Sequence, residues 1–554
     1  MTSREVLTIQ LGHYSNFIGT HWWNLQESNF SYDPANPSEV NHDVLYREGE
    51  NFKREVTYTP RLLLVDLKES CGYLKQEGTL YDIPRYQGTE CLLWDEEKVE
   101  VTQEEPATKT PFVKSLEEPS ETSEPTSYDL EDHINSWVDY LVPRFHPRTV
   151  NIVKQYKHEC TTQPFDVFTY GRNLWNAEKF SEDFCDRIRA YVEDCDLMQG
   201  FQIILDSVDG FAGLGASCMQ YLRDEYGKSI LSFPCMDSKK TEPSMSNLVQ
   251  ALNTALCWQQ IGEYSSLFSP LCCGQTGWPQ PGDPRPFNHL IYDAELNYHS
   301  SALLGTALDT LTLRYRRKEY PNVVLSDLCA DLNKLGRKAA ATSLSLPFPM
   351  VAKMDLIDVL DEFEGNIWTS LTPSCDIPMD KNMQSVVLRG IPEDRLKRSG
   401  PQAMKQMSKP AYRCSTVHEM MTLYLACTCH ASATYLSTIS SALNVKEPFP
   451  KIFSNDITET GDIAKWPVGS DVKSVPVMAG LHSGNTLGTM YESLHVQLSK
   501  IRSIKKFYAF MESGLEEDEF KECLNHLLDC KENYEDHYVI GKKWSVRREF
   551  GFSS

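Results

Sequence analysis

Residues 199–228 read QGFQIILDSVDGFAGLGASCMQYLRDEYGK, and this stretch decides the fold. The apolar run 201–205 is typical of a buried strand, the glycines after it suit a tight turn, and the remainder has helical spacing. An α/β protein uses this order to hold a phosphate, because a helix N-terminus offers unpaired N–H groups. The spacing of Gly210, Gly213 and Gly215 matches neither the dinucleotide fingerprint nor the Walker loop. By spacing alone, a phosphate site and a plain strand-to-helix turn are equally good interpretations.

The composition is that of a soluble globular protein. The chain has 554 residues, 41% of them hydrophobic, with a net charge of -23 and a sequence pI of about 5.1. Nucleic acid is not an expected partner, because phosphate backbones are recognised through Lys and Arg clusters. The 17 cysteines are odd in number and lack a recurrent spacing, which indicates free thiols in a reducing compartment.

The chain shows no targeting or membrane-spanning pattern. Its first residues, MTSREVLTIQLG, have no basic segment before an apolar stretch and no Arg-rich amphipathic pattern. No window approaches the roughly 18 apolar residues of a spanning helix. We therefore expect neither secretion nor organelle import, and any membrane association is expected to be peripheral.

Composition divides the chain into three parts. Residues 1–316 alternate strands and helices, which favours a parallel sheet, and end in an apolar helix at 300–316. Within this part, residues from about 95 to 132 are rich in Glu, Pro, Ser and Thr, and we expect a disordered acidic insertion that acts as a solvated spacer or, less simply, as a Ser/Thr docking segment. Residues 320–485 are expected to form a second α/β domain, and residues 490–554 a helical hairpin that turns at Gly514.

Motifs in the same order along most of the chain resemble the tubulin/FtsZ superfamily. The opening stretch keeps QGFQ, three of the five glycines of tubulin's GGGTGSG loop, and RDEY for REEY. Further segments in register with tubulin are LTIQLGHYSNFIGTHWW (7–23), YTPRLLLVDL (58–67), LPFP (346–349), SVVLRG (385–390) and KKFYAFMESGLEEDEF (505–520). The resemblance implies an α/β tubulin/FtsZ-like fold: a Rossmann-like N-terminal domain of nucleotide-binding type with a central helix, a second α/β domain, and a C-terminal helical hairpin.

Within that superfamily the chain is most similar to the Misato family of eukaryotic tubulin-related proteins. The words that carry this are REVLTIQLG (4–12), TYTPRLLLVDL (57–67), FCDRIRAYVEDCD (184–196) and SGLEEDEF (513–520). The resemblance implies a cytoplasmic protein, peripheral on the mitochondrial outer membrane, that regulates mitochondrial distribution, morphology and fusion. The implied partners are proteins at the mitochondrial outer surface, and tubulin or the cytosolic chaperonin.

The resemblance also implies a site for GTP or GDP with Mg, but its loops are only partly kept. GHYSN (12–16) retains Gly12 and Asn16 of tubulin's GQCGN. Asp66 is kept at the end of YTPRLLLVDL, while Lys68 stands where a carboxylate near magnesium is expected.

The signature loop, DGFAGLG (209–215), departs most. Gly210, Gly213 and Gly215 remain, but Phe211 and Ala212 replace a glycine and the threonine. The aspartate that opens the loop brings a negative charge near phosphate oxygens.

Three further positions complete the candidate site. Asn173 in GRNLWN resembles tubulin's GNNWA loop, and Asn297 in AELN resembles the base-binding Asn of GDLN. Asp331 in LSDLCADLNKL (325–335) is the nearest match to the catalytic Asp of GxxNxDxxR, although a solvated helix is the better interpretation of that segment. No metal site is expected, because CTCH (427–430) lacks zinc-ligand spacing.

We therefore predict an adaptor or organiser with a degraded GTP pocket rather than an enzyme. One alternative is an active tubulin-like GTPase that assembles longitudinally. The other is a tubulin-folding or spindle-assembly factor. The sequence does not separate the mitochondrial from the spindle role, nor fix the oligomeric state.

Overall fold

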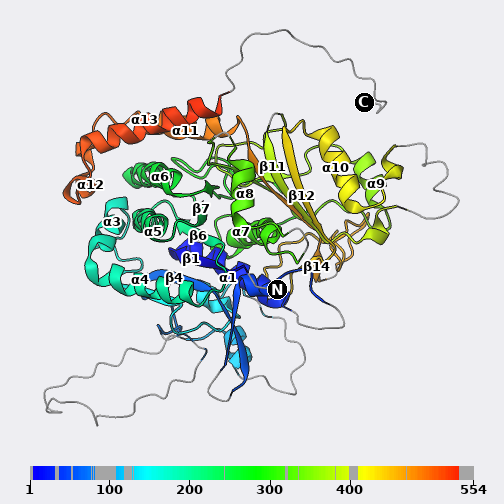
Figure 1. The fold of residues 1–554 in the computed structure, drawn as a ribbon, viewed down its shortest axis with the longest axis horizontal. Coiled ribbons are helices and arrows are strands. Elements are labelled where there is room, and N and C mark those ends of the chain that lie inside the picture. Colours follow the sequence, from blue (N-terminus) through cyan, green and yellow to red (C-terminus); the bar gives the residue numbers. More distant parts are fainter. Residues whose placement is uncertain are drawn as a thin grey trace, which may run out of the picture.

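The computed structural model describes residues 4–30, 37–50, 54–76, 78, 80, 108–117, 128, 130–241, 244–318, 322–334, 336–380, 382–397, 410–469 and 471–535. Two sheets lie side by side with a helix, α7 (Asn297–Thr312), between them, and a helical layer runs along one end (Figure 1). This is the α/β architecture that the sequence predicts, with the central helix in the expected stretch.

The first sheet has six parallel strands in the order β5-β4-β1-β6-β7-β8. They are β1 (Val6–Leu11), β4 (Leu62–Lys68), β5 (Val150–Lys157), β6 (Gly200–Asp206), β7 (Ser229–Cys235) and β8 (Leu267–Phe268). Leu11 pairs with Val65 on one side and Leu205 on the other, so β1, β4 and β6 end side by side. The prediction of a parallel sheet is confirmed.

Helices cover both faces of this sheet. One face carries α1 (His13–Ser28) and α7, and the other carries α3 (Phe168–Asn176), α4 (Glu178–Glu193), α5 (Gly210–Tyr226) and α6 (Met245–Tyr264). Alternate strand residues serve the two cores: Ile203 packs with the apolar residues of α5, and Ile204 with those of α1. A strand that is buried on both faces needs a nearly continuous apolar sequence. This explains why β1 and β6 consist mostly of apolar residues.

The second sheet has five strands in the order β10-β9-β15-β11-β12. They are β9 (Ala341–Ser345), β10 (Thr369–Ser370), β11 (Met383–Arg389), β12 (Ala433–Ile439) and β15 (Val477–Ser483); β11 and β12 run parallel and the other neighbours antiparallel. The helices α8 (Leu325–Leu332), α9 (Leu356–Glu362) and α10 (Val417–Thr428) belong to this half of the molecule. Because α7 contacts β11 and β15 as well as α1, it joins the two halves.

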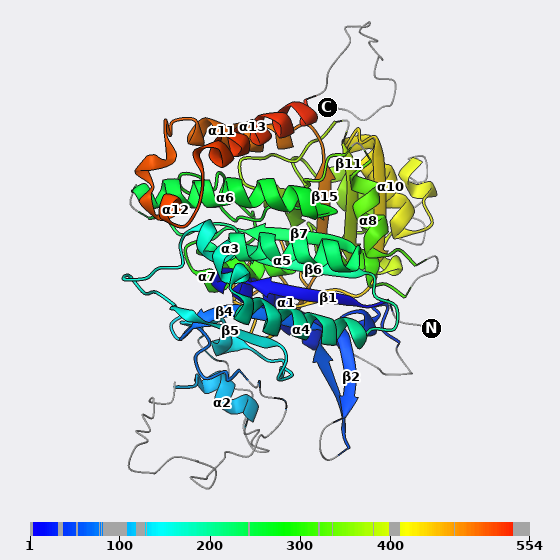
Figure 2. The ribbon, with the colours of Figure 1, turned by 60° about the vertical axis from the view of Figure 1, so that its left-hand side comes forward.

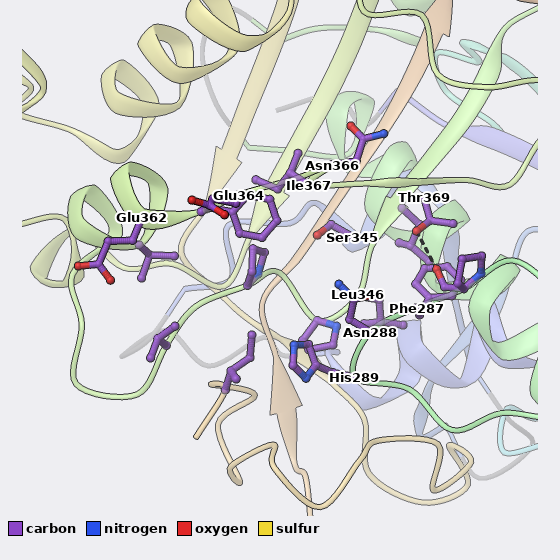
Figure 3. Close-up of a pocket in the computed structure, with 18 of the residues that line it drawn as sticks. Phe287, Asn288, His289, Ser345, Leu346, Glu362, Glu364, Asn366, Ile367 and Thr369 are labelled. Carbon is purple, nitrogen blue, oxygen red and sulfur yellow. Dashed lines mark hydrogen bonds between the residues drawn. The ribbon is translucent and has the colours of Figure 1, made fainter. Parts of the chain in front are cut away.

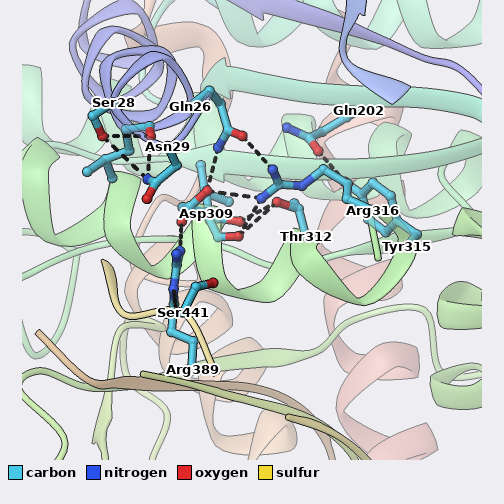
Figure 4. A network of polar contacts seen from close by, with 12 residues as sticks. Gln26, Ser28, Asn29, Gln202, Asp309, Thr312, Tyr315, Arg316, Arg389 and Ser441 are labelled. Atoms are coloured by element: carbon cyan, nitrogen blue, oxygen red, sulfur yellow. Dashed lines mark hydrogen bonds and ion pairs between the residues drawn. The ribbon is translucent and has the colours of Figure 1, made fainter. Parts of the chain in front are cut away.

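A polar network at the C-terminal end of α7 links the two halves of the molecule (Figure 4). Asp309 of α7 forms ion pairs with Arg316, 3.0 Å away, and with Arg389 of β11. Gln26 of α1 hydrogen-bonds both Asp309 and Arg316. The carboxylate and both guanidinium groups are at most 3% exposed, so the network is a buried link between α1, α7 and the second sheet.

The C-terminal layer consists of α11 (Leu487–Leu498), α12 (Tyr508–Glu512) and α13 (Glu517–Tyr534), and it lies over α6 (Figures 1 and 2). The chain reverses between α12 and α13 at Gly514, whose φ is 102°. A two-stranded hairpin of β2 (Tyr46–Glu50) and β3 (Val56–Pro60) projects from the body (Figure 2). The short elements are β13 (Leu443–Asn444), β14 (Ser474–Val475), η1 (His42–Val44), η4 (Trp137–Tyr140), η5 (Leu313–Tyr315), η6 (Glu393–Arg395), η8 (Pro410–Arg413) and η9 (Ile504–Lys506).

The acidic insertion predicted at 95–132 contains an ordered helix, α2 (Pro111–Glu117), so that prediction is wrong for this part. Phe112 and Val113 are buried in the same core as Trp137, and Thr110 donates a hydrogen bond to the carbonyl of Asp139. The physical reason is local. Phe112 and Val113 bury apolar surface, whereas the surrounding Glu- and Pro-rich sequence has few apolar side chains to bury. Residues 95–107 and 118–127 lie outside the described residues.

The described residues contain neither a membrane-spanning helix nor a disulfide bond. No helix among them has the length and apolar composition needed to cross a membrane. Their cysteines are all free thiols.

Candidate functional site

The candidate site lies where β1, β4 and β6 end, at the carboxyl edge of the first sheet. Ligands bind at this edge in open α/β sheets because the loops and helix N-termini gather there. Gly12 directly follows β1, Asp66 lies two residues before the end of β4, and Asp206 is the last residue of β6. The backbone N–H of Gly12 donates to the carbonyl of Val65 at 3.2 Å, which holds the first loop against β4.

Asp206 closes the N-terminus of α1. Its carboxylate accepts hydrogen bonds from the backbone N–H groups of Tyr14 at 3.0 Å and Ser15 at 2.7 Å, and from the Ser15 hydroxyl at 2.6 Å. Asp206 is 3% exposed. The sequence prediction did not include this residue, because its partners lie 191 and 192 positions earlier in the chain.

Asp66 is held by four donors or ring nitrogens of the chain. They are His13 Nδ1 at 3.2 Å, Asn16 Nδ2 at 3.1 Å, Trp137 Nε1 at 2.8 Å and the N–H of Leu67 at 2.8 Å. Burial disfavours the charged carboxylate, but the attraction of His13 and these hydrogen bonds outweigh it and lower the pKa of Asp66. The structure therefore brings Gly12, Asn16 and Asp66 together, and both oxygens of Asp66 accept hydrogen bonds from the chain.

His13 lies against the carboxylates of this cluster. Burial disfavours its charged form, yet the carboxylates of Asp66 and Asp206 outweigh burial and raise the pKa of His13. Its ring also contacts that of His158, with centroids 4.0 Å apart and the ring planes tilted by 36°. His13 thus compensates charge inside the site.

The signature loop begins α5, and Asp209 caps it. The Asp209 carboxylate accepts from the N–H of Phe211 at 2.8 Å, and burial followed by repulsion from Asp206 raises the pKa of Asp209 well above its usual value. Burial likewise raises the pKa of Asp206 to about 7, against the hydrogen bonds from Ser15 and Tyr14.

The three loop glycines serve close packing. A Cβ on Gly210 would lie 2.8 Å from the Phe165 ring, and one on Gly213 would lie 1.9 Å from the carbonyl oxygen of Phe168 on α3. A Cβ on Gly215 would lie 2.7 Å from Leu205. These positions face protein atoms, which explains their glycines without a phosphate.

Asn173 and Asn297 lie apart from this cluster. Asn173 is exposed on α3 and donates to the carbonyl of Ser513 at 2.9 Å, in the C-terminal layer. Asn297 begins α7, one turn before Ser300, which accepts from the Tyr14 hydroxyl at 3.0 Å. Asn297 therefore approaches the start of α1, whereas Asn173 does not.

Asp331 is a structural residue. It lies on α8 and forms an ion pair with Arg314, whose side chain is 5% exposed. Arg314 also donates to Ser385 at 2.8 Å, so Asp331 neutralises a buried cation between α8 and the second sheet. Asp331 thus has a structural partner within the chain, and the catalytic role considered for it stays a prediction.

The residues at this edge do not fit a magnesium nucleotide. At the starts of α1 and α5, the N–H groups of Tyr14, Ser15 and Phe211 already bind the side chains of Asp206 and Asp209. A phosphate would have to displace these carboxyl groups from the N–H groups that they occupy. Among the described residues, no group of His, Cys, Asp and Glu has the arrangement of a metal site.

A cavity lies elsewhere, at the border of the second sheet (Figure 3). It has a volume of about 510 Å³ and is lined by the segment 286–289, the end of β9 and the chain between α9 and β10. None of the predicted site residues lines it. Sequence reasoning missed this cavity, because its walls come from four separated segments without a shared motif.

Known proteins match the chain over nearly its whole length. A family described as "Misato Segment II tubulin-like domain" matches residues 4–118, and a "Tubulin domain" family matches residues 127–317. "Protein misato" of Drosophila melanogaster is 35% identical over 97% of this chain and 100% of its own length. "Protein misato homolog 1" of Bos taurus and of Homo sapiens are each 33% identical over 96% of this chain and 98% of theirs. With these identities over full-length alignments, the chain belongs to the Misato family of tubulin-like proteins.

Proposed function

We propose that this protein is an adaptor or organiser at the outer surface of mitochondria, where it regulates mitochondrial distribution, morphology and fusion. The resemblance to the Misato family motivates the organelle. The observation that carries the adaptor role is the closure of α1 and α5 by Asp206 and Asp209. A tubulin-like fold that cannot bind the phosphates of a nucleotide would act by binding partner proteins and not by hydrolysing GTP.

The alternative of a longitudinally assembling GTPase is disfavoured by the same geometry. It requires phosphate contacts at both helix N-termini and a free catalytic aspartate. Asp331 is paired with Arg314, and displacement of a catalytic group by even about 1 Å costs on the order of a hundredfold in rate.

A role in tubulin folding or spindle assembly, with tubulin or the cytosolic chaperonin as partner, is the second candidate. Acute depletion in non-dividing cells separates it from the mitochondrial role, because such cells have no spindle. We expect the mitochondrial network to collapse or fragment while soluble tubulin stays constant. A fall in tubulin before any mitochondrial change would instead support the folding role.

A further inference from the structure

Both helices that begin at the candidate site carry an aspartate of this chain at their N-terminus. Asp206 accepts three hydrogen bonds at α1, all between 2.6 and 3.0 Å, and Asp209 accepts one at α5. A helix N-terminus attracts anions through its unpaired N–H groups and its partial positive charge. In this chain the carboxyl groups of Asp206 and Asp209 occupy these positions in place of an external anion.

We propose that Asp206 is a built-in anion, which takes the place at α1 where the fold would hold a phosphate and makes the folded chain independent of a nucleotide. The carboxylate arrives from the end of β6, 191 residues after Ser15. One side chain thus ties β6 to the first turn of α1, a join that a bound ligand would otherwise supply. The inference does not depend on where in the cell the protein acts.

Gly12 gives independent geometric support. Its φ of 117° favours glycine, and a Cβ there would lie 2.3 Å from Oδ2 of Asp206. The carboxylate therefore fills the space beside the loop that a phosphate would need. Gly12 is required by Asp206 itself.

The donor set stabilises the ionised form of Asp206. Both backbone groups donate to its oxygens and cannot accept a proton from them. The titratable groups that face it are His13, Asp209 and Cys235. Burial raises its pKa to about 7, so the test belongs at about pH 8, where the carboxylate is charged.

The test compares Asp206→Ala with Asp206→Asn by thermal melting of the full chain at about pH 8. Asp206→Ala removes an acetate-sized group, and we expect its melting temperature to fall by several degrees and to recover saturably with millimolar acetate or inorganic phosphate, because a ligand that binds only the native state stabilises it. Asp206→Asn fills the same space without a charge and should show no recovery. Wild-type protein should not respond to acetate, phosphate or Mg-GTP.

Two results would overturn the proposal. One is an equal anion response of the alanine and asparagine variants. The other is a rise in the melting temperature of the wild type with Mg-GTP. If Asp206→Ala is insoluble, refolding yield with and without acetate replaces melting: acetate-dependent recovery supports the proposal, and failure in both buffers together with Mg-GTP binding by the wild type refutes it.

Discussion

At the scale of single residues, the carboxylates of the first sheet's edge decide what the site can do. Asp66 and Asp206 have the same chemistry and similar burial, yet their pKa values shift in opposite directions. Asp66 has His13 and the Trp137 indole as partners, whereas Asp206 has backbone donors and a neighbouring carboxylate. The opposite pKa shifts of Asp66 and Asp206 therefore come from their different partners and not from a difference in burial.

This difference predicts a pH dependence for Asp206. The native pKa of about 7 exceeds the unfolded value of about 3.9, so the native state binds the proton more tightly. The extra stability that comes from tighter proton binding at Asp206 is therefore full below about pH 4 and is lost as the pH rises to about 7, which leaves the hydrogen bonds that the charged carboxylate accepts.

Relative to Asp206→Asn, the free energy of unfolding of the wild type should fall by roughly 1 kcal/mol per pH unit in that window. Urea unfolding at several pH values measures this difference. Parallel curves for the two proteins would show that Asp206 titrates normally.

At the scale of elements, the sequence predicted those parts of the fold that rest on local patterns. Continuous apolar runs located β1 and β6, and a long apolar stretch located α7. The cap of α1 by Asp206 was not predictable, because a contact between residues 191 positions apart leaves no local signal. For the glycines of α5 the sequence leaves a phosphate site and a plain turn open, because it does not show that Phe165, Phe168 and Leu205 pack against them.

The join of α7 to the second sheet gives a prediction on stability. Asp309→Ala leaves Arg316 and Arg389 buried without their carboxylate, and breaking such a pair costs about 3–5 kcal/mol. Urea unfolding should show this loss. The matched control is Asp186→Ala, which removes an exposed partner of Arg189 and should leave the unfolding curve unchanged. Equal curves for both variants would contradict a role of the network in stability.

The helix α2 gives a second prediction at this scale. Phe112→Ala empties a buried site and should destabilise the protein by about 3 kcal/mol. Deletion of residues 118–127 should leave the cooperative melt nearly unchanged, because loop length costs only about 0.6 kcal/mol per doubling. A larger loss from the deletion than from Phe112→Ala would mean that 118–127 packs against the body.

At the scale of the whole molecule, charge constrains how the protein meets a membrane. A net charge of -23 disfavours adsorption to anionic lipid, so the proposed mitochondrial role leads us to expect a protein receptor as the tether. Carbonate or high-salt washing of isolated mitochondria should release the protein, and external protease should digest it while the outer membrane is intact. A soluble matrix protein is the control for membrane integrity. Resistance to washing or to protease would contradict peripheral attachment.

The central claim is a tubulin-like body whose phosphate sites are closed by its own aspartates. The most direct measurement is the guanine nucleotide released by denaturing the purified full-length protein, together with GTP hydrolysis by the native protein in the presence of magnesium. We predict far less than stoichiometric nucleotide and no hydrolysis above the buffer rate. Stoichiometric GTP or GDP, or turnover that Asp331→Ala abolishes, would contradict the account.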